Sequence, residues 1–378
     1  MRAFVFTDKA LERQAGRFVW LSVNTEKREN AALLGKFPVK VWPSFFVIDP
    51  ATEKIVFRWV GGATTPQMVK ILDDGAAAAG AGKKAAGALL ANADRLFAEG
   101  KNAEAATAYG EALRTLRKDS PSYPRAVESL LYALSSTNQH EACATAARDA
   151  FPNLKTSSSA ANVAGSGLDC ALSMKEGDPG RAGLVAALAA DARRVLDGPK
   201  EGLAADDVSA VYQTVAEERK AAKDEAGEKK VLEAWLAYLE EQAAAATTPA
   251  ARTVFDAHLT TVCLALGRPE RAVPALLASE KDFPDDYNPP QRLAILYGAM
   301  KKFDEALAAS DRAMALAYGP RKLVVYRTRV DLLKKKGDPD AARKTLQEML
   351  AYAEALPAEQ RSDRTIASIR KALEEAKN

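Results

Sequence analysis

The residue types that most often carry catalysis or hold metals are scarce in this chain, and the few present are far apart. Its three cysteines, Cys143, Cys170 and Cys263, form no CxxC pair, and its two histidines, His140 and His258, are equally isolated. A reactive thiol is activated by a nearby charge or second thiol, and a cysteine zinc site needs closely spaced ligands. We therefore predict buried, inert thiols, no disulfide framework, no metal, no cofactor and no catalytic residue in this chain.

The overall composition is that of an ordinary globular protein, with 378 residues, 48% apolar and 27% charged. The 53 Lys and Arg residues nearly balance the 50 Asp and Glu residues, which argues against nucleic acid or an anionic membrane as a partner. No apolar run approaches the ~18 residues of a membrane span. Asp8 and Glu12 lie where the apolar core of a signal peptide would be, so the chain as written is expected in the cytoplasm.

The first 74 residues are rich in aromatic and β-branched residues, unlike the rest of the chain, and we predict a small α/β domain there. The expected elements are a strand over 18–23, a short helix within 27–37, strands over 45–48 and 55–59, and a helix beginning over 66–72.

The stretches FVWLSVN, KFPVKVWPSFFVID and IVFRWVGG, in this order, resemble the thioredoxin fold. In that family a proline before the third core strand has a cis peptide bond and lies beside the redox site. The resemblance therefore implies a cis bond between Trp42 and Pro43 and a substrate-binding or peptide-binding role for Trp42, Pro43 and Ser44. The family's CxxC and the strand that precedes it are missing, so the domain is expected to be partial and inactive in redox chemistry.

Two explanations of the missing pieces remain open. Met1, Phe6 and Asp8 resemble the segment that follows the CxxC in a thioredoxin-like subfamily, so the assigned start can be too late. The longer protein would then be a thiol-disulfide oxidoreductase, and a periplasmic or exported location would become open. Alternatively, the domain is naturally degenerate and its remaining strands pair directly.

An Ala- and Gly-rich stretch over 75–84 is predicted to be a linker, and a repeat begins at about residue 85. A glycine followed five residues later by an alanine recurs about 35 to 45 residues apart, a period typical of stacked helical hairpins. The clear copies are Gly100/Ala105, Gly177/Ala182, Gly267/Ala272 and Gly337/Ala342; copies without glycine end near Cys143, Ala226 and Ala306.

This recurrence resembles the tetratricopeptide repeat family, with about seven helix pairs over 85–357 and a capping helix over 358–378. The resemblance implies a concave surface, lined mainly by the first helix of each pair, that holds a protein or peptide partner. Candidate groove residues on such helices are Gln291, Arg292, Arg327 and Asp331.

The predicted fold class is mainly α, a tetratricopeptide-like α-α solenoid with a small, N-terminally truncated thioredoxin-like α/β domain. The predicted function is a non-catalytic interaction scaffold or adaptor. The alternatives are a thioredoxin-like disulfide reductase whose CxxC lies upstream, and a spacer without a specific partner.

Overall fold

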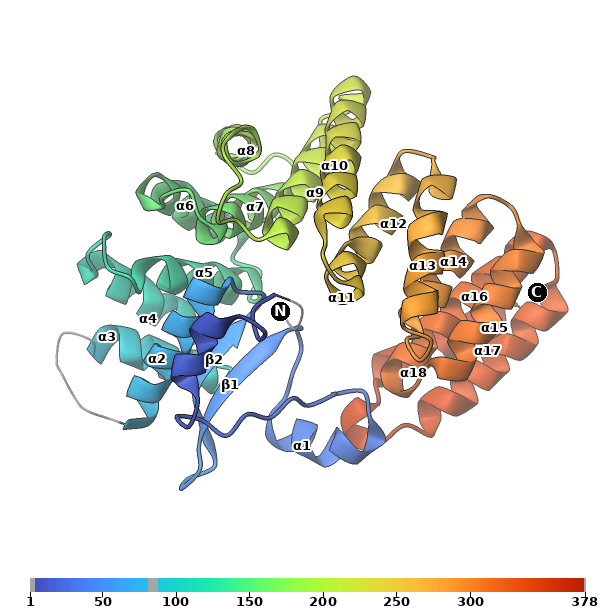
Figure 1. The fold of residues 1–378 in the computed structure, drawn as a ribbon, viewed down its shortest axis with the longest axis horizontal. Helices are drawn as coiled ribbons and strands as arrows, with labels where there is room; N and C mark the ends of the chain where they lie inside the picture. Colours follow the sequence, from blue (N-terminus) through green and yellow to red (C-terminus); the bar gives the residue numbers. More distant parts are fainter. Residues whose placement is uncertain (1–3, 81–87, 377–378) are drawn as a thin grey trace. The chain divides into compact units, whose positions relative to one another are not determined.

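The computed structural model describes residues 4–80 and 88–376 (Figure 1). Within these residues the chain is mainly α-helical with one small two-stranded sheet, so the prediction of a mainly α, helical-repeat fold is confirmed. The chain divides into two compact units. Unit 1 comprises 1–19 and 40–235, and unit 2 comprises 20–39 and 236–378.

Seven pairs of helices follow one another in the described part of the repeat region. The first four pairs are α3 (Ala88–Ala98) with α4 (Asn102–Thr115), α5 (Tyr123–Ser135) with α6 (His140–Ala150), α7 (Ser158–Ser173) with α8 (Arg181–Asp197), and α9 (Ala205–Ala221) with α10 (Glu225–Ala245). After a short α11 (Pro249–Arg252) come α12 (Asp256–Ala265) with α13 (Val273–Asp282), α14 (Asn288–Ala299) with α15 (Phe303–Leu316), and α16 (Lys322–Lys336) with α17 (Pro339–Glu354). A last helix, α18 (Asp363–Glu375), packs on α17 and buries Ile366 and Ile369.

The bends between paired helices lie where the sequence pattern placed them. Gly100 and Gly337 have φ values of 74° and 87°, a left-handed conformation that glycine adopts without a steric penalty. In the copies without glycine, Asn138, Lys223 and Lys301 adopt the same conformation, with φ between 56° and 61°. The left-handed backbone conformation at the bend therefore recurs even in the copies that have no glycine there.

The small sheet of unit 1 lies against the first repeats. Strands β1 (Ser44–Asp49) and β2 (Lys54–Val60) are antiparallel, and helix α2 (Thr65–Gly80) packs against them. Because side chains alternate along a strand, Phe57 and Trp59 are buried in the core that includes α2. Arg58 points to the opposite face, where its guanidinium lies 4.9 Å from the ring centre of Phe97 on α3.

A buried arginine joins this α/β segment to the helical repeats. Arg125 on α5 donates to both carboxylate oxygens of Asp94 on α3, at 2.8 and 3.1 Å, and to Asp74 on α2 at 2.9 Å. The hydroxyl of Tyr109 donates to Asp94 at 2.6 Å. The side chain of Arg125 is 6% exposed and stacks 5.0 Å from the ring centre of Phe57. The sheet and α2 therefore cover the first helix pairs as part of the same packed body.

Residues 20–39 instead belong to unit 2, where the short helix α1 (Ala31–Lys36) packs beside the turn before α18. The Gln360 side-chain amide donates to the backbone oxygens of Thr25 and Lys27, at 3.0 and 3.1 Å. Arg321 pairs with Glu26 at 2.7 Å. These contacts hold an early segment of the chain on the last repeats of unit 2.

Three expectations for the first part of the chain need correction. No strand forms over 18–23, because an extended segment becomes a strand only beside a strand that accepts its hydrogen bonds, and β1 and β2 form the whole described sheet. The expected domain over 1–74 is divided between the two units. The expected linker over 75–84 is helical over 75–80, and 81–84 lie outside the described residues.

The peptide bond between Trp42 and Pro43 is cis.

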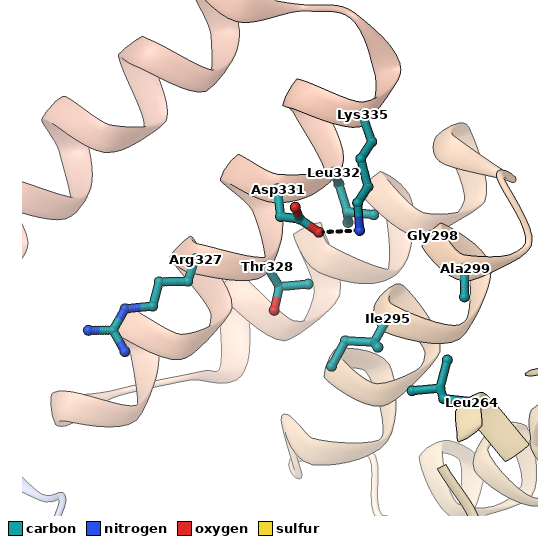
Figure 2. A pocket seen from close by; sticks show the side chains of 9 residues that line it. All are labelled: Leu264, Ile295, Gly298, Ala299, Arg327, Thr328, Asp331, Leu332 and Lys335. Carbon is teal, nitrogen blue, oxygen red and sulfur yellow. Dashed lines mark ion pairs between the residues drawn. The ribbon is translucent and has the colours of Figure 1, made fainter. Parts of the chain in front are cut away.

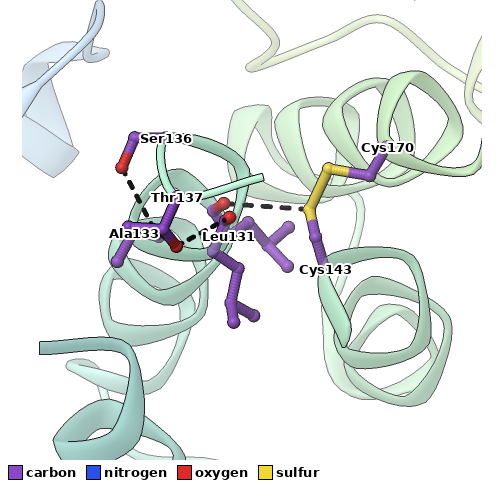
Figure 3. The surroundings of a disulfide bond; sticks show 7 residues. Leu131, Ala133, Ser136, Thr137, Cys143 and Cys170 are labelled. Atoms are coloured by element: carbon purple, nitrogen blue, oxygen red, sulfur yellow. Dashed lines mark hydrogen bonds between the residues drawn. A yellow bond between two sulfur atoms is a disulfide. The ribbon is translucent and has the colours of Figure 1, made fainter. Parts of the chain in front are cut away.

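The expectation of three free thiols is also wrong. Cys143 on α6 and Cys170 on α7 form a disulfide with their Cα atoms 6.0 Å apart (Figure 3). Both residues are fully buried, and the carbonyl oxygen of Leu131 lies 3.7 Å from the Cys143 sulfur. The two cysteines are 27 residues apart in sequence, but the packing of one helix pair on the next brings α6 and α7 face to face. Cys263 is free and buried, as expected.

We expect Arg125→Met to destabilise unit 1 by about 3–5 kcal/mol, since it leaves the buried carboxylate of Asp94 without its cation, whereas Asp74 keeps its ion pair with Lys70. Urea unfolding followed by circular dichroism measures the change. The matched control is Arg148→Met, whose exposed pair with Asp149 should contribute under about 1 kcal/mol. An equal effect of the two substitutions would contradict the structural role given to Arg125.

The disulfide can be tested by counting thiols. Chain denatured without reductant should show one reactive thiol, from Cys263, and reduced chain should show three. Reduction should lower stability by about 3–4 kcal/mol for a loop of this length. Cys263→Ala should leave this difference unchanged, whereas three thiols in unreduced chain would exclude the bond.

Candidate functional site

A cavity of about 380 Å³ opens on unit 2, on the first helices of three successive pairs (Figure 2). The residues that line it lie on α12, α14 and α16, and the second helix of each of these pairs does not contribute. The apolar part of the lining is Leu264, Ile295, Ala299 and Leu332. First helices face the same side in a stack of helical hairpins, which explains why residues far apart in sequence meet here.

The rim of this cavity is polar and carries more positive than negative charge. Asp331 and Lys335, one helical turn apart on α16, form an ion pair at 2.7 Å, with both side chains more than half exposed. Arg327 is exposed one turn earlier, and Figure 2 shows its guanidinium pointing away from that pair. Among the residues that the structure describes, none forms an ion pair or hydrogen bond with Arg327. The rim therefore offers one uncompensated cation.

Two residues fix the shape of the cavity, one behind the lining and one in it. Gln291 is 6% exposed, and its amide donates to the Thr328 hydroxyl on the cavity wall at 2.6 Å. Gly298 allows α14 and α16 to approach closely, because a Cβ there would lie 2.4 Å from a methyl carbon of Leu332. A larger residue at position 298 would therefore push Leu332 and alter the cavity.

The four residues expected to face a groove have different locations. Arg327 and Asp331 line the cavity, and Gln291 supports it from behind. Arg292 is outside the lining, where burial lowers its pKa and the charges of Asp256 and Asp286 favour its charged form. Sequence reasoning missed the apolar lining and Lys335. The signal that could have found them is spacing: residues 295 and 299, and residues 328, 332 and 335, are three or four positions apart and so share one face of their helix.

The other expected site, Trp42, Pro43 and Ser44, belongs to unit 1. Trp42 is 52% exposed, Pro43 is exposed and Ser44 begins β1. In the described residues, no cluster of three or more His, Cys, Asp or Glu side chains is placed to hold a metal ion. No helix there is both long and apolar enough to pass through a membrane.

Unit 1 carries a second polar network on its first helices. Glu128 on α5 accepts hydrogen bonds from Ser159 and Asn162 on α7, at 2.5 and 3.0 Å, and Gln67 on α2 donates to Ser159. Burial raises the pKa of Glu128 to about 7. Burial also raises the pKa of Asp207 on α9 to about 6, and the two carboxyl groups repel each other when both are charged. The network therefore changes protonation near neutral pH.

Comparison with known proteins adds only distant structural likenesses. No protein-family model matches the sequence, and neither does any curated protein. A tetratricopeptide repeat protein from Parabacteroides merdae is 11% identical, with a TM-score of 0.47 over 78% of this chain and 99% of that one. The TPR2AB domain of yeast Sti1, solved as a pHSP90 complex, is 13% identical with a TM-score of 0.30, covering 78% and 98% of the two chains. The RpL4 assembly chaperone Acl4 is 16% identical with a TM-score of 0.37, covering 78% and 98%.

The raised pKa of Glu128 gives a pH dependence with a definite sign. In the unfolded chain this carboxyl group ionises near 4.5, and in the folded chain near 7, so the folded state holds its proton longer. Stability should therefore fall as pH rises from about 4.5 to 7. Glu128→Gln should flatten the fall in melting temperature between pH 5 and pH 8, whereas Glu111→Gln, at an exposed position on α4, should leave it unchanged. Equal pH profiles for the two variants would contradict this assignment.

Proposed function

We propose that this protein is a non-catalytic interaction scaffold, and that the cavity of unit 2 holds an extended segment of a partner protein. The observation that carries the proposal is the cavity's chemistry: an apolar floor from three consecutive first helices beside the uncompensated charge of Arg327. Apolar pockets with a few placed polar groups are typical binding sites.

The same chemistry selects the kind of partner segment. An aliphatic or aromatic side chain would fill the space between Ile295 and Leu332, where it loses contact with water. A carboxylate two or three residues away along the segment would pair with Arg327. Lys335 is already paired with Asp331 and adds less. We therefore propose an apolar residue followed or preceded by an acidic one.

A finer proposal, that the α/β segment is a redox-inactive thioredoxin-like module, rests on fewer observations. It is supported by the order of β1, β2 and α2 and by the cis proline before β1. The two strands are fewer than that fold requires, and the described part of the α/β segment contains no cysteine. A disulfide reductase function for this chain gains no support from these residues.

A peptide-display selection against the full chain tests the scaffold proposal. Selected peptides should carry an apolar residue near an acidic one, and fluorescence anisotropy should show at least tenfold weaker binding to Arg327→Glu, about 1.4 kcal/mol. Ile295→Asp should also weaken binding, because it places a charge on the apolar floor.

The matched control is Lys334→Glu, which makes the same charge change on the same helix at an exposed position outside the lining. It should bind selected peptides as the unmodified chain does. Failure to select any peptide, or equal losses in Arg327→Glu and Lys334→Glu, would overturn the proposal.

A further inference from the structure

Strand β1 has one edge that β2 does not use. The Gly61 amide donates to the Pro43 oxygen at 2.9 Å, so residues 43, 45 and 47 direct their backbone groups toward β2. Ser44, Phe46 and Ile48 therefore direct their N–H and C=O groups the other way. In the described part of the chain, no backbone or side-chain group hydrogen-bonds to these outward groups. The main elements that pack against β1 are β2 along one edge and α2 on one face, and the ring of Phe6 lies 6.0 Å from that of Phe45.

This edge lacks the devices that usually protect an exposed strand. No charged residue lies between Lys40 and Asp49, and no proline follows Pro43 within the strand. The strand side chains are half-buried, and Trp42 beside them is 52% exposed. An apolar edge with unpaired backbone groups is a template for another strand.

We propose that the partner of this edge is β1 of a second copy, paired antiparallel about a two-fold axis to give a continuous four-stranded sheet. One register pairs every outward group: Phe46 lies opposite itself on the axis, and Ser44 lies opposite Ile48. A shift by two residues in either direction leaves an outward residue of β1 unpaired.

The charges at the ends of the strand fit this register. Asp49 lies opposite Pro43 of the other copy, so the strand's one acidic residue does not face another acid. Phe46 side chains meet across the axis, and aromatic cross-strand pairs stabilise sheets. The surface lies in unit 1, so the proposal is independent of the cavity of unit 2.

Cross-linking tests the register directly. Residues opposite each other in a hydrogen-bonded antiparallel pair have Cα atoms about 5.5 Å apart, a distance that suits a disulfide. The native thiols should not interfere, because Cys143 and Cys170 are bonded to each other and burial raises the pKa of Cys263 to about 11. Mild oxidation of Phe46→Cys should therefore give a covalent dimer on a non-reducing gel.

The matched control uses the neighbouring outward residue. Ile48→Cys alone should not cross-link, because it lies opposite Ser44, whereas a mixture of Ser44→Cys and Ile48→Cys chains should form a mixed dimer. Equal cross-linking of Phe46→Cys and Ile48→Cys, or no cross-linking of Phe46→Cys, would overturn the register.

Light scattering on the unmodified chain tests for the dimer without introducing any cysteine. The mass should rise with concentration from 40.5 kDa toward about twice that value. Phe46→Pro removes an outward N–H but no β1–β2 hydrogen bond, and Phe46→Lys places like charges on the axis. Both should stay monomeric, and Phe46→Val should still dimerise. A monomeric unmodified chain, or dimers of Phe46→Lys, would refute the proposal.

Discussion

The buried guanidinium of Arg125 determines how the beginning of this chain relates to its repeats. A cation at this depth is stable only with its carboxylates in place, and those carboxylates come from α2 and from the first repeat helix. The α/β segment and the first helix pairs therefore depend on each other. Arg58 on β2 stacks on the ring of Phe97 on α3 and adds a second contact across the same junction. The sheet and α2 act as a cap on a helical array, which would otherwise expose the apolar side of α3.

The helical pairs could be predicted from sequence because each depends on local signals: a residue tolerant of positive φ at the bend and apolar residues three and four apart. The failures all depend on distant partners. The 18–23 segment has strand-forming residues but no adjacent strand, and Ala- and Gly-rich residues 75–80 continue a helix that packs on Val47. The pairing of Cys143 with Cys170 and the burial of Arg292 beside Asp256 depend on which helix faces meet, which spacing alone does not specify.

The two surfaces proposed for binding use different chemistry. The cavity of unit 2 offers side chains, an apolar floor and one free cation, and so would select a partner by its sequence. The edge of β1 offers backbone groups, which any strand can pair, so its selectivity must come from register and from the absence of opposing charges. A scaffold with both surfaces would present two copies of its cavity in one dimer, which raises the effective concentration for a partner with two binding segments.

Native-state hydrogen exchange measures whether the α/β segment is a cap or a separate domain. If it is a cap, the amides of β2 and α2 should exchange through the same opening, with the same free energy and urea dependence, as those of α3 and α5. If β2 and α2 instead exchange through an opening of their own while α3 and α5 stay protected, the segment folds independently, and the account of Arg125 as the group that joins them is wrong.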